Sequence, residues 1–256
     1  MENDPLPWLA APTTAGTGAE MTRNAVLDSP AHRVKRSLRD ARLVARAALL
    51  DPELTRDAPR NVTAAAGLDA ITQLFESALS RKARPETTAA ALAALPWARA
   101  ALPRVLRDPA DMPARAAMLM AAGVSGLCLA HSGLGLAHAL AAPLGGRRGV
   151  AHGVACGALL PHVLRHNRAA AGPALDAACA AWLGASPGPT ATERALEELA
   201  ALVADGDLPL DWRAADWTAG ELDALARDAV GSSLAGNPRP MSAGDVREFL
   251  RGLIGV

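Results

Sequence analysis

The chain has 256 residues, of which half are hydrophobic and only 3% are aromatic. The 26 Lys and Arg residues balance the 26 Asp and Glu residues, so net charge gives no indication of a nucleic acid or an anionic membrane as partner. Ala and Leu make up most of the hydrophobic residues, and their high helix propensity favours closely packed helices over a β-sandwich.

The first residues, MENDPLPW, lack the basic-then-apolar pattern of a signal peptide, and we expect no membrane-spanning segment. Three cysteines, Cys128, Cys156 and Cys179, are an odd number without CxxC spacing and lie in apolar surroundings. They are typical of buried thiols in a reducing compartment. These features predict a cytoplasmic protein.

The strands are expected between residues 6 and 50. A short apolar run at residues 8–11 precedes the segment PTTAGTGAE at residues 12–20, whose glycines permit a tight turn or close approach to a ligand. Its threonines offer hydroxyl groups to a phosphate or a ribose, although an ordinary turn explains the same residues. Residues 42–50 are a second candidate strand, ended by Asp51 and Pro52.

Helical periodicity dominates from residue 58 onward, and little or no β-structure is expected there. The first predicted helix is capped by Asn61 or Thr63 and runs to Leu79. Further helices are expected over residues 86–107, 113–130, 173–184, 191–204 and 219–230, with a last helix capped by Ser242. On the first of them, Asp69 and Gln73 are four residues apart and share a face beside apolar neighbours. Because an unpaired buried carboxylate is costly, Asp69 is expected in a salt bridge, in a cap, or as a metal ligand.

Five of the six histidines lie between residues 131 and 167. They are His131, His138, His152, His162 and His166. The segment is interpreted as an apolar helix, a break at residues 143–146, a basic turn at Arg147 and Arg148, and a second helix. Histidine is a frequent metal ligand and general acid or base, so this segment is the strongest candidate for a site.

Several motifs occur in an order that resembles the iron-containing (group III) alcohol dehydrogenase family. They are PTTAGTGAE at 12–20, DPELT at 51–55, GLDAITQLFES at 67–77, HALAAPLGGRRGVAHGVACGALLPHV at 138–163, and NPRP at 237–240. The resemblance implies a mainly α protein, in which residues 58–256 form an all-helical metal-binding domain. Residues 1–57 are then the remnant of a nucleotide-binding α/β domain. The implied activity is that of an oxidoreductase interconverting an alcohol and a carbonyl compound with a nicotinamide cofactor.

The resemblance also assigns candidate site residues. The metal-ligand positions of the family fall on Asp69, Gln73, His138 and His152, and the dinucleotide positions fall on Thr13, Thr14, Thr17, Gly18 and Lys35. Gln73 stands where the family usually has a histidine, and Ala142 stands where many members carry another. The implied cofactors are a divalent metal, Fe²⁺ or Zn²⁺, and NAD or NADP.

The chain begins shortly before PTTAGTG, so the resemblance implies that the Gly-rich pyrophosphate loop is absent. The expected explanations are a piece of a longer enzyme, a partnership with a separate nucleotide-binding chain, or a loss of redox chemistry. A metal-assisted lyase or dehydratase and a non-catalytic helical subunit are therefore kept as alternatives. The expected partners are a small alcohol or carbonyl substrate and a second copy or a nucleotide-binding chain, but no nucleic acid and no membrane.

Overall fold

The computed structural model describes residues 3–29, 34–208, 210, 212 and 216–255, with only the backbone described for residues 28, 29 and 34–36. The helices are α1 (Arg60–Leu79), α2 (Pro85–Arg107), α3 (Met112–Ser132), α4 (Leu136–Arg148), α5 (His152–Leu183), α6 (Pro189–Asp205), α7 (Ala219–Asp228) and α8 (Ala243–Ile254). The expectation of a mainly α fold is confirmed.

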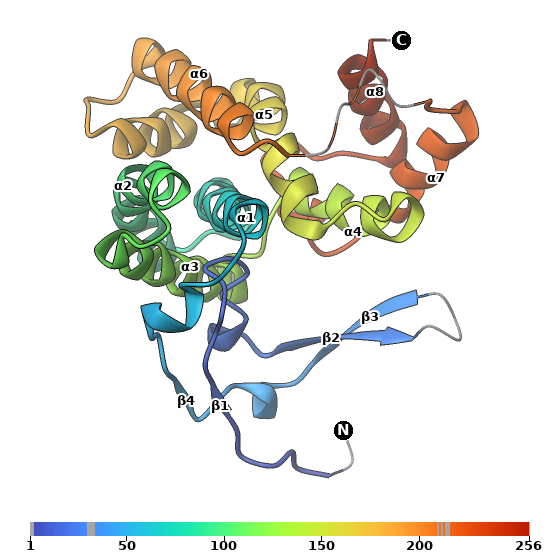
Figure 1. The fold of residues 1–256 in the computed structure, drawn as a ribbon. Helices are drawn as coiled ribbons and strands as arrows, with labels where there is room; N and C mark the ends of the chain where they lie inside the picture. The colour runs from blue at the N-terminus through green and yellow to red at the C-terminus, as the bar shows by residue number, and fades with distance from the viewer. Residues whose placement is uncertain (1–2, 30–33, 209, 211, 213–215, 256) are drawn as a thin grey trace.

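The helices pack around two hydrophobic clusters (Figure 1). The larger cluster is formed by α1, α2, α3, α6 and the later part of α5, and includes Leu68, Leu102, Met118, Trp182 and Leu199. The smaller cluster is formed by α4, the first turns of α5, α7 and α8, and includes Leu140, Leu144, Leu159, Leu225 and Leu250. Helix α1 is buried almost throughout from Gly67 to Leu79, so polar residues on it must find partners inside the protein.

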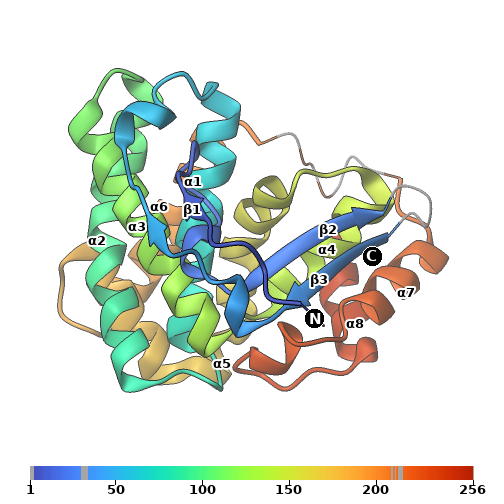
Figure 2. The same ribbon diagram turned by 90° about the horizontal axis from the view of Figure 1, so that it is seen from below.

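The strands of the described residues all precede residue 50, as expected. Strand β1 (Leu9–Ala10) pairs in parallel with β4 (Ala47–Ala48), and β2 (Asn24–Ser29) pairs antiparallel with β3 (Val34–Arg39). The β2–β3 hairpin extends below α4 in Figure 1 and crosses in front of it in Figure 2. The hairpin therefore lies on the side of the helical region that faces down in Figure 1.

The predicted strand at residues 42–50 is wrong in most of its length. Residues Ala41–Leu43 form a 3-10 turn because the Asp40 side chain accepts a hydrogen bond from the Arg42 backbone N–H, and only Ala47 and Ala48 pair with another strand. The predicted cap of α1 by Asn61 or Thr63 is also wrong, since the helix begins after Pro59 without a side-chain cap. The cap of α8 by Ser242 is confirmed.

The predicted helix break at residues 143–146 is wrong as well. Helix α4 continues through Pro143 to Arg148 and ends at Gly149, whose φ of 67° suits glycine. The preceding helix, expected over residues 113–130, is α3, which ends at Gly133, also with φ 67°. His138 therefore lies in the first turn of a new helix and His152 begins the next one, and this arrangement determines the geometry of the site.

Helix α5 consists of the two helices expected on either side of residue 172, which meet at a kink. It runs from His152 to Leu183 with a kink at Gly172 (φ 44°, ψ −122°), immediately before Pro173.

Helix α3 is long and apolar enough to cross a membrane, contrary to the expectation of no such segment, but 56% of its most apolar window is buried inside the protein. Its contacts with α1 and α2 in the larger cluster account for that composition.

Candidate metal centre

Asp69 provides the carboxylate of the site from the middle of α1. Its side chain is only 2% exposed, and its Oδ1 lies 3.1 Å from His138 Nε2 and 3.8 Å from His152 Nε2. The sequence left open a salt bridge, a cap or a metal ligand for this residue. The structure places it against two imidazoles from distant parts of the chain.

His138 lies in the first turn of α4, where Glu76 of α1 fixes its orientation. Glu76 Oε2 lies 2.7 Å from His138 Nδ1 and accepts a hydrogen bond from the Gly135 backbone N–H at 3.0 Å, while Oε1 accepts one from the Ala137 N–H at 2.7 Å. A carboxylate from α1 therefore caps the positive end of α4. The approach is close at Gly135, where an added Cβ would lie 2.9 Å from Glu76 Oε1 and the carboxylate would have to shift.

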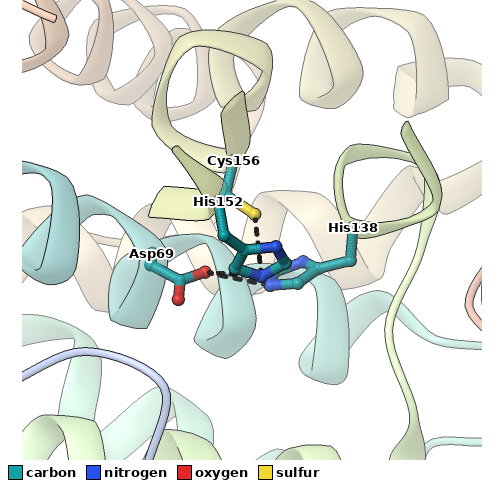
Figure 3. A group of neighbouring side chains, drawn as sticks. All are labelled: Asp69, His138, His152 and Cys156. Atoms are coloured by element: carbon teal, nitrogen blue, oxygen red, sulfur yellow. Dashed lines mark hydrogen bonds and ion pairs between the residues drawn. The ribbon is translucent and has the colours of Figure 1, made fainter. Parts of the chain in front are cut away.

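His152 and Cys156 complete the group from the first turns of α5. They are four residues apart and so share a helix face, and Cys156 Sγ lies 3.6 Å from His152 Nε2. Figure 3 shows Asp69, His138, His152 and Cys156 converging on one point from α1, α4 and α5. Their donor atoms all lie within 4.8 Å of one another. The His152 side chain is 46% exposed, which leaves the group open to solvent on one side.

These donors fit a divalent transition metal. Imidazole, carboxylate and sulfur together suit Zn²⁺ or Fe²⁺. Both nitrogens of His138 face carboxylate oxygens, whereas a neutral imidazole has only one N–H. If Nδ1 donates to Glu76, Nε2 needs a second proton or a cation between it and Asp69. A carboxylate that orients a metal-binding imidazole in this way is common at metal sites.

The protonation of the group follows from burial and mutual contact. Burial alone would lower the pKa of His138, but the Cys156 sulfur and the hydrogen-bonding carboxylates of Asp69 and Glu76 raise it well above its ordinary value. Burial opposes ionisation of Asp69, yet the hydrogen bond from His138 and the nearby His152 lower its pKa. Burial raises the pKa of the Cys156 thiol to about 12. Contact with the two imidazoles therefore offsets the cost of burying the Asp69 carboxylate.

Gln73 is not directed to the same contacts. It is buried one turn after Asp69 on α1, and its Oε1 accepts a hydrogen bond from Ser125 Oγ of α3 at 2.9 Å.

The sequence reasoning did not identify Glu76 or assign a role to Cys156. The signal for Glu76 was its spacing of seven residues from Asp69, two helical turns along the same face, and that for Cys156 was its spacing of four from His152.

Four of the predicted dinucleotide residues, Thr13, Thr14, Thr17 and Gly18, lie in the segment that follows β1. Thr13, Thr14 and Thr17 are exposed, whereas Gly16 and Gly18 pack on helices α1 and α3. Gly18 has φ 59°, and an added Cβ would overlap the backbone of α3 at Ala122 and Gly126. The structure therefore gives Gly18 a packing role. Lys35 lies on β3, and its side chain is outside the described part of the protein.

The remaining histidines and the two arginines lie elsewhere. His162 and His166 line a separate surface hollow with Arg239 and Phe249, and the His166 ring meets the Phe249 ring edge-on at 5.0 Å. Arg147 and Arg148 are exposed but do not form the predicted turn. They end α4 and form ion pairs with Asp228 and Glu221 of α7.

The NPRP motif supports the site from behind. Asn237 Oδ1 accepts hydrogen bonds from the Leu136 backbone N–H at 3.2 Å and from Asn167 Nδ2 at 2.8 Å. Asn237 therefore links the start of α4, which carries His138, to α5, which carries His152. Its role is positional.

Comparisons with known proteins identify the family of the chain. The family model described as "Fe-containing alcohol dehydrogenase family, C-terminal" matches residues 63–254, and the model described as "Iron-containing alcohol dehydrogenase" matches residues 1–52. Long-chain-alcohol dehydrogenase 1 of Geobacillus thermodenitrificans is 33% identical over 96% of this chain and 63% of its own length. The 1,3-propanediol dehydrogenase of Citrobacter freundii is 33% identical over 97% of this chain and 65% of its own.

Solved structures are similar over the whole chain. A 1,3-propanediol oxidoreductase superposes with a TM-score of 0.91 at 29% identity, covering 99% of this chain and 67% of that one. An alcohol dehydrogenase from Oenococcus oeni gives 0.90 at 27% identity, covering 99% and 67%. The chain thus spans a little under two thirds of the length of the first two relatives.

Proposed function

The chain belongs to the iron-containing alcohol dehydrogenase family, and from this premise we propose that it is the metal-binding part of an oxidoreductase that interconverts an alcohol and a carbonyl compound with a nicotinamide cofactor. The observation that carries the proposal is the convergence of Asp69, His138 and His152, which lie on three helices, at one partly open point. When bound there, a divalent cation supplies Lewis-acid polarisation of the substrate oxygen.

The residues of this chain have separate tasks in that site. Asp69 and His138 would hold the cation from the buried side. Glu76 accepts a hydrogen bond from protonated Nδ1 of His138, so that Nε2 would coordinate the cation through its lone pair. His152 would hold it from the exposed side, where a small alcohol or aldehyde can enter. Gln73, expected from the sequence as a further ligand, would contribute its amide oxygen only by giving up or sharing the bond from Ser125.

The cofactor is proposed to lie on the N-terminal side. Thr13, Thr14, Thr17, Gly18 and Lys35 are proposed to contact NAD or NADP, and residues 1–57 are proposed to belong to the nucleotide-binding region, with residues 58–256 as the metal-binding domain. The exposure of the three threonines supports this assignment. We also propose a cytoplasmic location, which three unpaired, buried cysteines support.

The nucleotide-binding partner is proposed to cover the strands. Large apolar side chains are exposed on and beside them at Leu9, Val26, Leu27, Leu38 and Leu49. Parallel strands normally have both faces covered, yet Leu9 of β1 and Ala47 of β4 are exposed. A nucleotide-binding segment or chain docked on β1 and β4 would bury this surface and bring the dinucleotide toward His152.

Metal uptake tests the proposal directly. The purified chain, stripped with a chelator, should take up one Zn²⁺ or Fe²⁺ per chain by mass spectrometry, and the melting temperature should rise. His138→Ala and His152→Ala should each abolish uptake, whereas the exposed His131→Ala should retain it. Gln73→Ala should weaken binding less than either, and Gln73→His should strengthen it. If the wild-type chain takes up neither ion and its melting temperature does not change, the proposal fails.

A further inference from the structure

We propose that Cys156 is the fourth protein ligand of the metal, and that its thiolate makes the site selective for Zn²⁺ over Fe²⁺. The inference rests on the metal site of the proposed function and extends it to a residue and a metal preference. It also replaces Gln73, the fourth ligand expected from the sequence, with a donor from another helix.

The spacing of the donor atoms supports binding by four protein ligands, to which a substrate oxygen would add as a fifth. With zinc bonds of about 2.0–2.1 Å to nitrogen or oxygen and about 2.3 Å to sulfur, a tetrahedron has edges of about 3.3–3.6 Å. The measured edges are 3.1 Å from His138 Nε2 to Asp69 Oδ1, 3.8 Å from His152 Nε2 to Asp69 Oδ1, and 3.6 Å from Cys156 Sγ to His152 Nε2. These three edges lie within about 0.5 Å of the zinc values. All four donor atoms lie within 4.8 Å of one another, so modest side-chain movements would bring them to one ion.

The origin of each side chain also favours Cys156 over Gln73. Cys156 is fully buried and lies on the same face of α5 as His152, which directs its sulfur to the two imidazoles (Figure 3). Gln73 Oε1 instead accepts a hydrogen bond from Ser125 on α3. By contrast, Cys128 has an ordinary structural role, since its thiol donates to the Thr87 carbonyl oxygen at 3.3 Å. Cys128 therefore serves as a control.

The chemistry of sulfur sets the metal preference. On binding, the S–H bond breaks, the sulfur keeps the electron pair and donates it to the cation, and the proton passes to solvent. A thiolate is a soft donor, and divalent zinc binds mixed sulfur and nitrogen sites more tightly than divalent iron does. A site with Cys156 should thus retain Zn²⁺ in competition with Fe²⁺, although the family is named for iron.

Cobalt(II) is the probe, because it occupies zinc sites and a thiolate ligand gives it an intense near-ultraviolet charge-transfer band. The metal-free full chain should bind one Co²⁺ with this band, and Zn²⁺ should displace the cobalt. Cys156→Ser should lose the band and weaken Zn²⁺ binding at least about tenfold. Cys128→Ser and Gln73→Ala should retain the band. Cys156→Ala should lose the band as well, which would exclude an effect of the serine hydroxyl, and circular dichroism would check that both variants fold.

The outcomes separate the two proposals. Cobalt binding by the wild type without the band, or equal Zn²⁺ affinity in wild type and Cys156→Ser, overturns the role of Cys156 while leaving the metal site of the proposed function intact. Stronger retention of Fe²⁺ than of Zn²⁺ overturns the stated selectivity. No uptake of any of the three ions by the wild type overturns both proposals.

Discussion

Replacing Glu76 with glutamine should destabilise the protein because no orientation of the amide can serve all the donors around it. In the structure, one carboxylate oxygen accepts from the Ala137 N–H, and the other accepts from the Gly135 N–H and faces His138 Nδ1. Glutamine has one oxygen and one NH₂ group. If the NH₂ replaces Oε1, the Ala137 N–H loses its acceptor, and if it replaces Oε2, Gly135 and His138 lose theirs.

The smaller of these losses sets the magnitude. One buried donor left without a partner costs about 1–3 kcal/mol, and each remaining bond, no longer made to a charge, weakens by about 1 kcal/mol. Removing a buried charge returns part of this by relieving its desolvation. We expect a net loss of about 3 kcal/mol in the free energy of unfolding, which corresponds to a fall of about 6–12 °C in melting temperature for a chain of this size.

The assay is thermal and urea unfolding followed by circular dichroism, with a chelator present so that metal binding does not contribute. Glu197→Gln, a change at an exposed position on α6, is the matched control and should behave as wild type. Repeated with Zn²⁺, the Glu76→Gln protein should also bind metal about 10–100-fold more weakly. A Glu76→Gln protein within about 0.5 kcal/mol of wild type would refute the proposed cap of α4.

Three further outcomes are expected. Glu20 is buried, and its Oε1 has no partner among the described residues. Burial raises the pKa of Glu20 above 4.5. The contribution of the protonated Glu20 to stability is therefore present below pH 4.5 and is lost as the pH rises through the raised pKa. The Glu20→Gln protein should therefore exceed wild type in stability at neutral pH but not in acid, by urea unfolding across pH; a constant difference would contradict this. Gly18→Ala should lower the free energy of unfolding by about 2–4 kcal/mol, because the backbone is left-handed and the added Cβ overlaps α3. Gly252→Ala, in open space on α8, is the control and should raise it by up to about 1 kcal/mol. Equal melting temperatures of the two variants would contradict the packing role of Gly18. Calorimetry should show NAD(H) or NADP(H) binding by the isolated chain no tighter than about 1 µM, near −8 kcal/mol, and tighter binding would show that the N-terminal segment suffices.

The helices and part of the site could be predicted from sequence because they depend on local patterns. Apolar spacing identified α1, α2, α3 and α6, and motif order identified Asp69, His138 and His152 as candidates that the structure brings together. The hairpin was missed because β2 and β3 bury little, and Val26 and Leu27 are consecutive exposed residues instead of an alternating pattern. The helix break was misplaced because α4 tolerates Pro143, while Gly149 provides the turn.

The residues that were missed depend on tertiary structure. Glu76 is an ordinary acidic residue on α1 until α4 begins beside it, and Cys156 is an ordinary buried thiol until α4 and α5 fold back on α1. No local pattern reports which helix end will lie against which side chain. The candidate metal ligands could be found in the sequence, but which of them come together depends on where α4 and α5 begin in the folded protein.

Helix α5 couples the two hydrophobic clusters during unfolding. Leu160 and Leu164 pack in the larger cluster, while their neighbours Leu159 and Val163 pack in the smaller one. Neither cluster can lose this helix without exposing apolar residues of the other, so the two should melt in a single cooperative transition. Amide hydrogens in these turns should exchange with solvent only through global unfolding. Binding of an ion at His152 should therefore slow their exchange by the same factor by which it stabilises the whole fold.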